Sequence, residues 1–367
     1  MRIAVIIDTW FPFVGGGQIN AWEISKRVAQ YGDEVEIITR NCGKDNLQKL
    51  KNLKVTKLGK LSKADDDLSR LKYLLQALVY ITRNDFDLVV AHAFLPGLVA
   101  RLLMVIKKKP AILVVHGTSI GTGLNRGPKA VLEKFILTKI KYSAEITVSR
   151  DFPKIKNINK SIVYIPNGVD LRFFKPSGQS KRVQNELLFV GRLHPQKNLV
   201  NLIEAIQLLK SENFLVRLTI IGSGPQKQEI LDLINKHSLK GIIKLEGEKT
   251  PPELVNYYNH SAAFILPSIY EGQALTVLEA WASKTPVIVS KTGDNTYLVK
   301  EGVNGYFIDN QSSPKSIAQA IKKALGDKNL NKTGQNGYNL VKDSYTWENS
   351  ARLTKALYDK VFKESIS

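Results

Sequence analysis

The chain has 367 residues, of which 43% are hydrophobic and 23% charged, which is typical of a globular protein long enough for two domains with separate cores. Its single cysteine, Cys42, excludes an internal disulfide and a cysteine-rich metal site. The net charge of +20 is unevenly placed, because residues 1–175 hold 29 Lys and Arg against 15 Asp and Glu, which gives +14.

The N-terminus enters a strand at once and lacks the apolar core and cleavage site of a signal peptide. The longest apolar stretch without a charge, residues 88–100, is too short to span a bilayer. We therefore expect a cytoplasmic protein, and the basic first half favours peripheral contact with anionic membranes. Aromatic residues do not alternate with the basic ones as a stacking platform requires, so nucleic acid is not expected as a partner.

In the first half, short apolar strands alternate with amphipathic helices. The expected strands are residues 3–7, 35–39, 88–91, 112–115, 146–148 and 162–165. The expected helices between them are residues 18–31, 68–83, 97–107 and 129–142. Apolar strands separated by helices indicate a parallel sheet that is covered on both faces.

The second half repeats this alternation. Its expected strands are residues 187–190, 217–221, 242–245, 263–266 and 287–289, with helices beginning near Asn198, Gln226, Pro252, Thr276 and Pro314. A turn signal at 165–170 and an exposed linker at 175–180 predict two domains, residues 1–175 and 176–346. Two doubly wound domains joined by a hinge would place the ligand cleft between the C-terminal ends of both sheets.

Two features of the first domain could line that cleft. Gly15, Gly16 and Gly17 follow the first strand and let a backbone approach a phosphate, although a flexible turn is the simpler interpretation. They lack the spacing of a dinucleotide fingerprint, which argues against an NAD enzyme. His116 directly follows the strand at 112–115, where it could donate a hydrogen bond or carry a proton, and the glycine-rich loop 121–127 would suit a lid. A lone histidine is more often structural.

The second domain offers two cations in one loop. Arg192 and Lys197 follow Gly191 at the end of a strand, and together they could grip a diphosphate and stabilise a leaving group. His194, between them, has no role that the sequence indicates. Gly222 lies in the next strand-to-helix turn, where it would allow close approach.

Two carboxylates, Glu271 and Glu279, flank a loop-to-helix junction after a buried strand. We expect Glu271 in the loop and Glu279 about two turns into the helix. The intervening backbone amides, which have no partner inside the helix, would form a phosphate site. These amides belong to Gly272, Gln273, Ala274 and Leu275. An ordinary corner with surface glutamates is an equally good interpretation of this segment alone.

A run of three aspartates at 65–67 is the one segment that suggests a metal. It lies between a lysine-rich stretch and a helix, and acidic residues commonly begin a helix near its positive end. We therefore assign no metal site.

These segments, in their order along the chain, resemble the GT-B fold retaining glycosyltransferases of glycosyltransferase family 4. The matching segments are residues 15–17, 116–117, 148–149, 165–170, 190–193 with Lys197, 221–224, 271–279 and 345–348. The resemblance implies two Rossmann-like doubly wound domains facing across a cleft, with the terminal helix 347–367 packing back onto the first, acceptor-side domain. The second domain would bind the donor.

The resemblance also implies roles. Arg192 and Lys197 would bind the diphosphate of a UDP- or GDP-sugar donor, assisted by the loop around Gly16 and the amides of residues 273–275. Glu279 would hold the ribose, while Glu271 and His116 would contact the transferred sugar. Such enzymes need no cofactor and generally no metal, and they pass the sugar to a glycan or lipid-linked acceptor in cell-surface polysaccharide or glycolipid synthesis.

The chain departs from the family pattern in two places. It has Gln273-Ala274 where the family commonly has Phe-Gly, and it has Thr-Gly-Asp-Asn at 292–295 where the family usually has two glycines followed by an acidic residue. Backbone contacts survive the first change, so the departures concern the donor-pocket shape. A catalytically silent binding subunit and a sugar-nucleotide epimerase of the same fold are the alternatives. The presence of Glu271, Arg192, Lys197 and His116 argues against a silent subunit.

Overall fold

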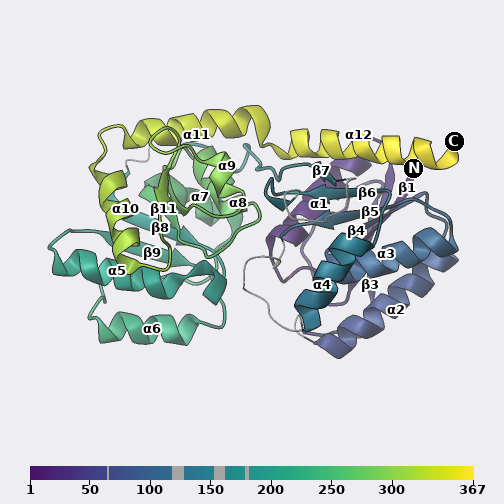
Figure 1. The fold of residues 1–367 in the computed structure, drawn as a ribbon, viewed down its shortest axis with the longest axis horizontal. Coiled ribbons are helices and arrows are strands. Elements are labelled where there is room, and N and C mark those ends of the chain that lie inside the picture. Colours follow the sequence, from purple (N-terminus) through teal and green to yellow (C-terminus); the bar gives the residue numbers. More distant parts are fainter. Residues whose placement is uncertain (64–65, 118–127, 153–161, 178–181) are drawn as a thin grey trace. The chain divides into compact units, whose positions relative to one another are not determined.

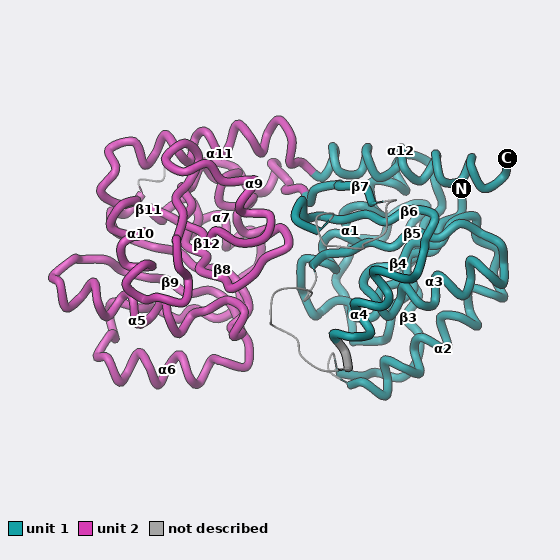
Figure 2. Tube along the Cα trace, viewed as in Figure 1, with its two compact units in different colours: residues 1–167, 347–367 teal, residues 168–346 magenta. Residues whose placement is uncertain are grey.

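The computed structural model describes residues 1–63, 66–117, 128–152, 162–177 and 182–367. The chain forms two compact units, Met1–Asn167 with Trp347–Ser367, and Gly168–Thr346 (Figure 2). Each unit has its own parallel sheet with helices around it, which confirms the expected α/β class. The boundary falls after Asn167, where the sequence suggested residue 175, because the backbone N–H of Val169 donates to the carbonyl of Tyr345 in the second unit (2.9 Å).

The sheet of the first unit has seven strands in the order β3-β2-β1-β4-β5-β6-β7. The strands are β1 (Arg2–Ile7), β2 (Glu34–Arg40), β3 (Leu53–Leu58), β4 (Leu88–His92), β5 (Ala111–Val115), β6 (Ala144–Thr147) and β7 (Ile162–Tyr164). The strand order reverses between β1 and β4, where Ile7 is paired with His92. Loops leaving the carboxyl ends of strands at such a reversal form a crevice that can hold a ligand.

Helices cover both faces of this sheet (Figure 1). They are α1 (Gly16–Gln30), α2 (Asp67–Arg83), α3 (Phe94–Ile106), α4 (Pro128–Lys139) and α12 (Trp347–Ile366). One core cluster joins the inner sides of α2, α3 and α4 to the sheet, while α12 packs beside α1 on the other face. An ion pair between Arg27 of α1 and Glu348 of α12 (2.7 Å) links these two helices.

The aspartates at the start of α2 act as helix-capping residues. Asp66 accepts a hydrogen bond from the backbone N–H of Ser69 (3.0 Å), which caps α2, and Asp67 pairs with Arg70. Asp65 lies outside the described residues. The structural interpretation of this run therefore holds for the two aspartates that are described.

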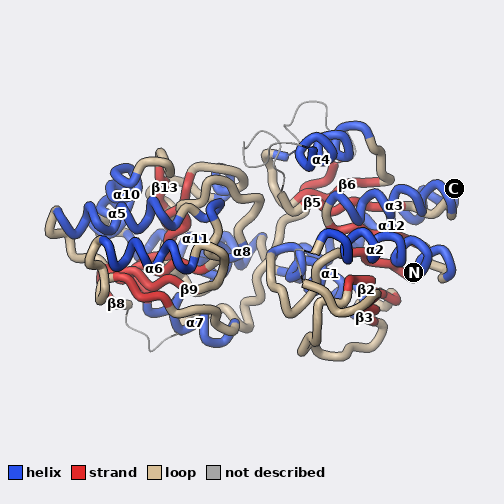
Figure 3. Tube along the Cα trace, turned by 90° about the horizontal axis from the view of Figure 1, so that it is seen from below, coloured by secondary structure: helices blue, strands red, loops and turns tan. Residues whose placement is uncertain are grey.

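The second unit has a six-stranded parallel sheet in the order β10-β9-β8-β11-β12-β13. Figure 3 shows the strands in red with the helices around them in blue. Its strands are β8 (Val183–Val190), β9 (Arg217–Ile221), β10 (Ile243–Leu245), β11 (Ser261–Leu266), β12 (Val287–Ser290) and β13 (Tyr306–Ile308). Its helices are η2 (Pro195–Lys197), α5 (Leu199–Ser211), α6 (Lys227–Lys236), α7 (Pro251–His260), α8 (Leu275–Ala282), α9 (Asn295–Leu298), α10 (Pro314–Gly326) and α11 (Leu330–Ser344). The strand order reverses between β8 and β11.

The elements that sequence patterning missed are short or carry polar residues. Strand β3 contains two lysines, and β13, although apolar, is only three residues long. Helix α11 contains Gly334 and Gly337, which lower helix propensity. A Cβ at either position would lie 2.0 Å from a neighbouring atom, of Lys284 or Trp281, so close packing requires these glycines.

Candidate active site

The candidate residues lie at the carboxyl ends of strands beside the two order reversals. In the first unit the glycine loop follows β1 and His116 follows β5, with His92 ending β4 between them. In the second unit Arg192 and Lys197 follow β8, and Glu271 follows the neighbouring strand β11. The structure therefore places each set at the part of its sheet where doubly wound folds bind ligands.

Lys197 and Glu271, which are 74 residues apart, form an ion pair with Nζ 2.5 Å from Oε1. Both side chains are largely buried, and the loops that carry them are fastened to each other. Gln196 donates its side-chain Nε2–H to the carbonyl of Tyr270 (2.8 Å) and accepts at its own carbonyl from the backbone N–H of Ile269 (2.8 Å). The position of the pair is thus set by backbone contacts on both sides.

His194, for which the sequence indicated no role, has a structural one. Its Nδ1 accepts a hydrogen bond from the backbone N–H of Gln196 (3.3 Å) and so caps η2, the short helix that carries Lys197. Burial and the nearby charges of Arg192 and Lys197 lower the pKa of His194. A neutral imidazole is the form that can accept this hydrogen bond.

Arg192 is exposed and forms no ion pair with any other residue that the structure describes. Beside it, the turns after β8 and β9 are in contact, since a Cβ at Gly222 would lie 1.9 Å from the carbonyl oxygen of Gly191. Gly222 also has a φ of +141°, which only glycine adopts readily. The Gly222 turn thus approaches the protein backbone closely, and its contact with a ligand stays a prediction.

Sequence reasoning missed the backbone support of Glu271. Gly293 has a φ of +53°, and a Cβ there would lie 1.7 Å from the carbonyl oxygen of Glu271. The next residue, Asp294, donates its backbone N–H to the carbonyl of Gly272 (3.0 Å) and accepts at Oδ2 from Nε2 of Gln273 (3.0 Å). The two departures from the family pattern, at 273 and at 292–295, thus interact directly with each other.

Helix α8 begins at Leu275, so Glu279 lies about one turn into it, and the expected two turns were wrong. Ala274 is the N-cap and forms no side-chain capping bond, and no described group accepts from the backbone N–H groups of Leu275 and Thr276. The hydroxyl of Tyr258 donates to Oε2 of Glu279 (2.8 Å). Burial raises the pKa of Glu279 to about 7, and the hydrogen bond from Tyr258 opposes this shift.

His116 in the first unit is half of a histidine pair. Its Nε2 lies 2.8 Å from Nδ1 of His92, and the two rings stack with centroids 5.1 Å apart. Burial lowers the pKa of His116 to about 4, and burial together with the neighbouring His116 lowers the pKa of His92 well below its usual value, so both are neutral at pH 7. Nδ1 of His116 is buried without a hydrogen-bond partner among the described residues.

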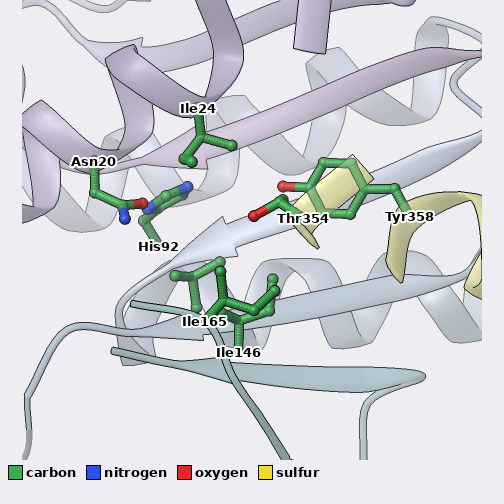
Figure 4. Close-up of a pocket in the computed structure, with 8 residues that line it drawn as sticks. Asn20, Ile24, His92, Ile146, Ile165, Thr354 and Tyr358 are labelled. Carbon is green, nitrogen blue, oxygen red and sulfur yellow. The ribbon is translucent and has the colours of Figure 1, made fainter. Parts of the chain in front are cut away.

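The pair lies against the glycine loop and above a small cavity. Any residue other than glycine at position 17 would place its Cβ 3.3 Å from Cδ2 of His116. Figure 4 shows the cavity beneath His92, with the hydroxyls of Thr354 and Tyr358 pointing into it from α12. The position of His92 at a strand end beside His116 was the signal that sequence reasoning overlooked. The expected lid, residues 121–127, lies outside the described residues.

The chain matches two family models that together cover both units. Residues 14–173 match Glycosyltransferase Family 4, and residues 172–340 match Glycosyl transferases group 1. The chain belongs to the group 1 glycosyltransferases, of the family 4 type, and its two parallel-sheet units form a GT-B fold. No described helix is both long and apolar enough to cross a membrane.

Similar proteins agree with this assignment. The UDP-Gal:alpha-D-GlcNAc-diphosphoundecaprenol alpha-1,3-galactosyltransferase of Escherichia coli is 26% identical over 74% of this chain and 76% of its own length. Sucrose-phosphate synthase from Thermosynechococcus elongatus has a similar structure, with a TM-score of 0.86, 22% identity and 99% of each chain covered. HepE of Anabaena in complex with UDP-glucose has a TM-score of 0.78 at 16% identity, covering 98% of this chain and all of that one.

Proposed function

We propose that this protein transfers a sugar from a UDP- or GDP-sugar to an acceptor hydroxyl with retention of anomeric configuration and without a metal ion. The observation that carries the proposal is the Lys197–Glu271 ion pair, which joins the cationic loop after β8 to the carboxylate loop after β11. The exposed Arg192 precedes Lys197 in the same loop, and the two amides at the start of α8 follow Glu271 in the chain.

These groups suit a diphosphate. Arg192 can donate two parallel hydrogen bonds to a phosphate, and the amides of Leu275 and Thr276 can bind a second one at the positive end of α8. Lys197 adds positive charge where negative charge develops as the glycosyl bond breaks. In this proposal, cationic side chains of the protein stabilise the leaving group in place of a metal ion.

Glu271 is better suited to stabilising charge than to covalent attack, because Nζ of Lys197 lies against its carboxylate. The ion pair favours a same-face path for the transfer. In that path the bond from the anomeric carbon to the phosphate oxygen breaks, and a bond to the acceptor oxygen forms on the same face. The leaving phosphate oxygen takes the acceptor's proton, while Glu271 stabilises the positive charge at the anomeric carbon.

Glu279 can accept hydrogen bonds from the ribose hydroxyls at Oε1, since the hydroxyl of Tyr258 is bonded to Oε2. As a neutral imidazole, His116 can form a hydrogen bond with the transferred sugar. The name of the Escherichia coli relative includes a UDP-sugar and a lipid-linked acceptor, which supports a glycan or lipid-linked acceptor here. The corresponding pathway would be cell-surface polysaccharide or glycolipid synthesis.

The test is a panel of UDP-, GDP- and ADP-sugars incubated with the purified protein in the presence of chelator. Chromatography would measure the released nucleoside diphosphate, and NMR of the anomeric proton would report the configuration of the product. We expect one donor to be slowly hydrolysed with retention. A silent subunit would release no diphosphate from any donor, and an epimerase would convert one sugar nucleotide into another.

A further inference from the structure

The outward face of α2 is apolar. Leu68, Leu71, Leu75 and Val79 follow one another at helical spacing on the side opposite the buried Tyr73-Ala77-Ile81 row, and they keep 46–63% of their surface exposed. An ordinary surface helix carries polar residues on this side. Helix α2 is therefore apolar on two opposite sides, of which the fold covers one.

The apolar surface continues over the next two helices. Helix α3, which packs beside α2, exposes Leu102, Val105 and Ile106, and α4, which packs beside α3, exposes Val131, Leu132 and Phe135. All three helices cover the same side of the sheet, so these ten side chains, here called the α2–α4 face, point away from one core. Apolar residues gathered in this way indicate an interaction surface.

Exposed cations surround and interrupt the α2–α4 face. They are Lys72, Arg83, Lys107, Lys108, Lys134, Lys139 and Lys141. Exposed carboxylates in the described part of residues 67–141 are limited to Asp67 and Asp85. The combination of an apolar centre with a basic surround is that of helices that lie in the headgroup region of an anionic bilayer.

We propose that the α2–α4 face docks the first unit onto an anionic lipid bilayer, with the leucines in the acyl boundary and the lysines at the headgroups. Charge selects this occupant over a second copy of the chain. A symmetric dimer through this face would bring the same basic residues into opposition. The second unit serves as a reference, because its exposed large apolar side chains, such as Leu208, Leu215 and Val303, do not form a row along one helix.

The test measures partition onto phosphatidylcholine vesicles with and without phosphatidylglycerol, by co-sedimentation of the full chain. Leu71→Ser with Leu75→Ser tests the apolar centre, and Leu208→Ser with Leu215→Ser is its matched control in the second unit. Lys72→Gln with Lys139→Gln tests the charges, against Lys227→Gln with Lys236→Gln on α6. All of these side chains are exposed, and thermal unfolding verifies that each variant folds.

We expect the wild type to sediment with anionic vesicles and not with neutral ones. The lysine pair should lower the partition coefficient roughly 25-fold, at about 5-fold for each charge near the surface. The leucine pair should lower it by at least as much, and both control pairs should bind like the wild type. Equal binding to neutral vesicles, or α2–α4 variants that bind like their controls, would overturn the proposal. So would a dimer in solution that the leucine pair dissociates. None of these outcomes depends on donor chemistry.

Discussion

The two units carry different kinds of side chain at the carboxyl ends of their strands. Those of the second unit hold an ion pair, an exposed arginine and a glycine contact that fixes the backbone of Glu271. Those of the first unit hold two neutral histidines, and seven exposed cations of that unit lie on the helices of the α2–α4 face or next to them. In the proposed reaction, the charged groups of the second unit suit the diphosphate of the donor, and the neutral histidines suit hydrogen bonds to the hydroxyls of the transferred sugar.

The sharpest way to break this contrast is to remove a charge from the second unit. Lys197→Ala should lower the turnover of the donor by about 100-fold or more, because it removes stabilisation of the leaving phosphate and leaves Glu271 buried alone. Steady-state kinetics on the donor identified by the panel measures this. Lys236→Ala on α6 is the control, and a fall of less than threefold in the Lys197 variant would refute the role.

Backbone support should matter next. Gly293→Ala should lower the free energy of unfolding by about 3 kcal/mol, because it combines positive-φ strain with a clash against the carbonyl of Glu271. Gly302→Ala is the matched control, with a φ of +67° but no atom within 4 Å of the new Cβ, and should lose about 1 kcal/mol. Urea unfolding compares the two. Equal losses would show that the contact with Glu271 has no energetic weight.

The histidine pair should make stability depend on pH. Because burial holds both pKa values below those of the unfolded chain, unfolding takes up protons as the pH falls below about 6.5. Between pH 7 and pH 4.5 the wild type should therefore lose at least about 2 kcal/mol more than a variant with His92→Gln and His116→Gln, since His116 alone contributes about that much and His92 adds to it. Chemical unfolding across this range measures the difference. Parallel losses would mean that the pair is protonated in the fold.

Glu279 should show the opposite sign. Its pKa of about 7 lies above that of an unfolded glutamate, so its contribution is present at low pH and is lost as the pH rises through 7. Glu279→Gln should therefore stabilise the donor-free protein by roughly 1–2 kcal/mol at pH 8 and leave it unchanged at pH 4. Thermal unfolding at the two pH values tests this, and a gain that is the same at both would contradict it.

The succession of strands and helices along the chain could be predicted from the sequence because the core strands are continuous apolar runs. Strands such as β4 and β11 are buried along their whole length, which periodicity detects. Strand β3 and helix α11 could not be found in this way, because tertiary contacts form them against their own composition. The glycines of α11, which weaken a helix in isolation, are the residues that let it pack against Trp281.

The sequence predicted which individual residues of the candidate site lie at strand ends, but not which of them contact each other. The pairing of Lys197 with Glu271 could not be predicted, since it depends on β8 and β11 being neighbours, which no local pattern reveals. The strand-end position of His92, directly after the expected strand 88–91, could be recognised from the sequence, but its contact with His116 depends on the sheet order. Gln273 and Asp294 looked like two separate departures from the family, and their hydrogen bond makes them one structural feature.

The central claim is that the second unit binds a nucleoside diphosphate through cations and amides of the protein. Calorimetric titration of UDP and GDP against UMP and GMP, with chelator present, tests it most directly. We expect one diphosphate to bind at least about 100-fold more tightly than its monophosphate, since the added phosphate gains two charge-assisted contacts. Equal affinity for the diphosphate and the monophosphate of each base would contradict the account.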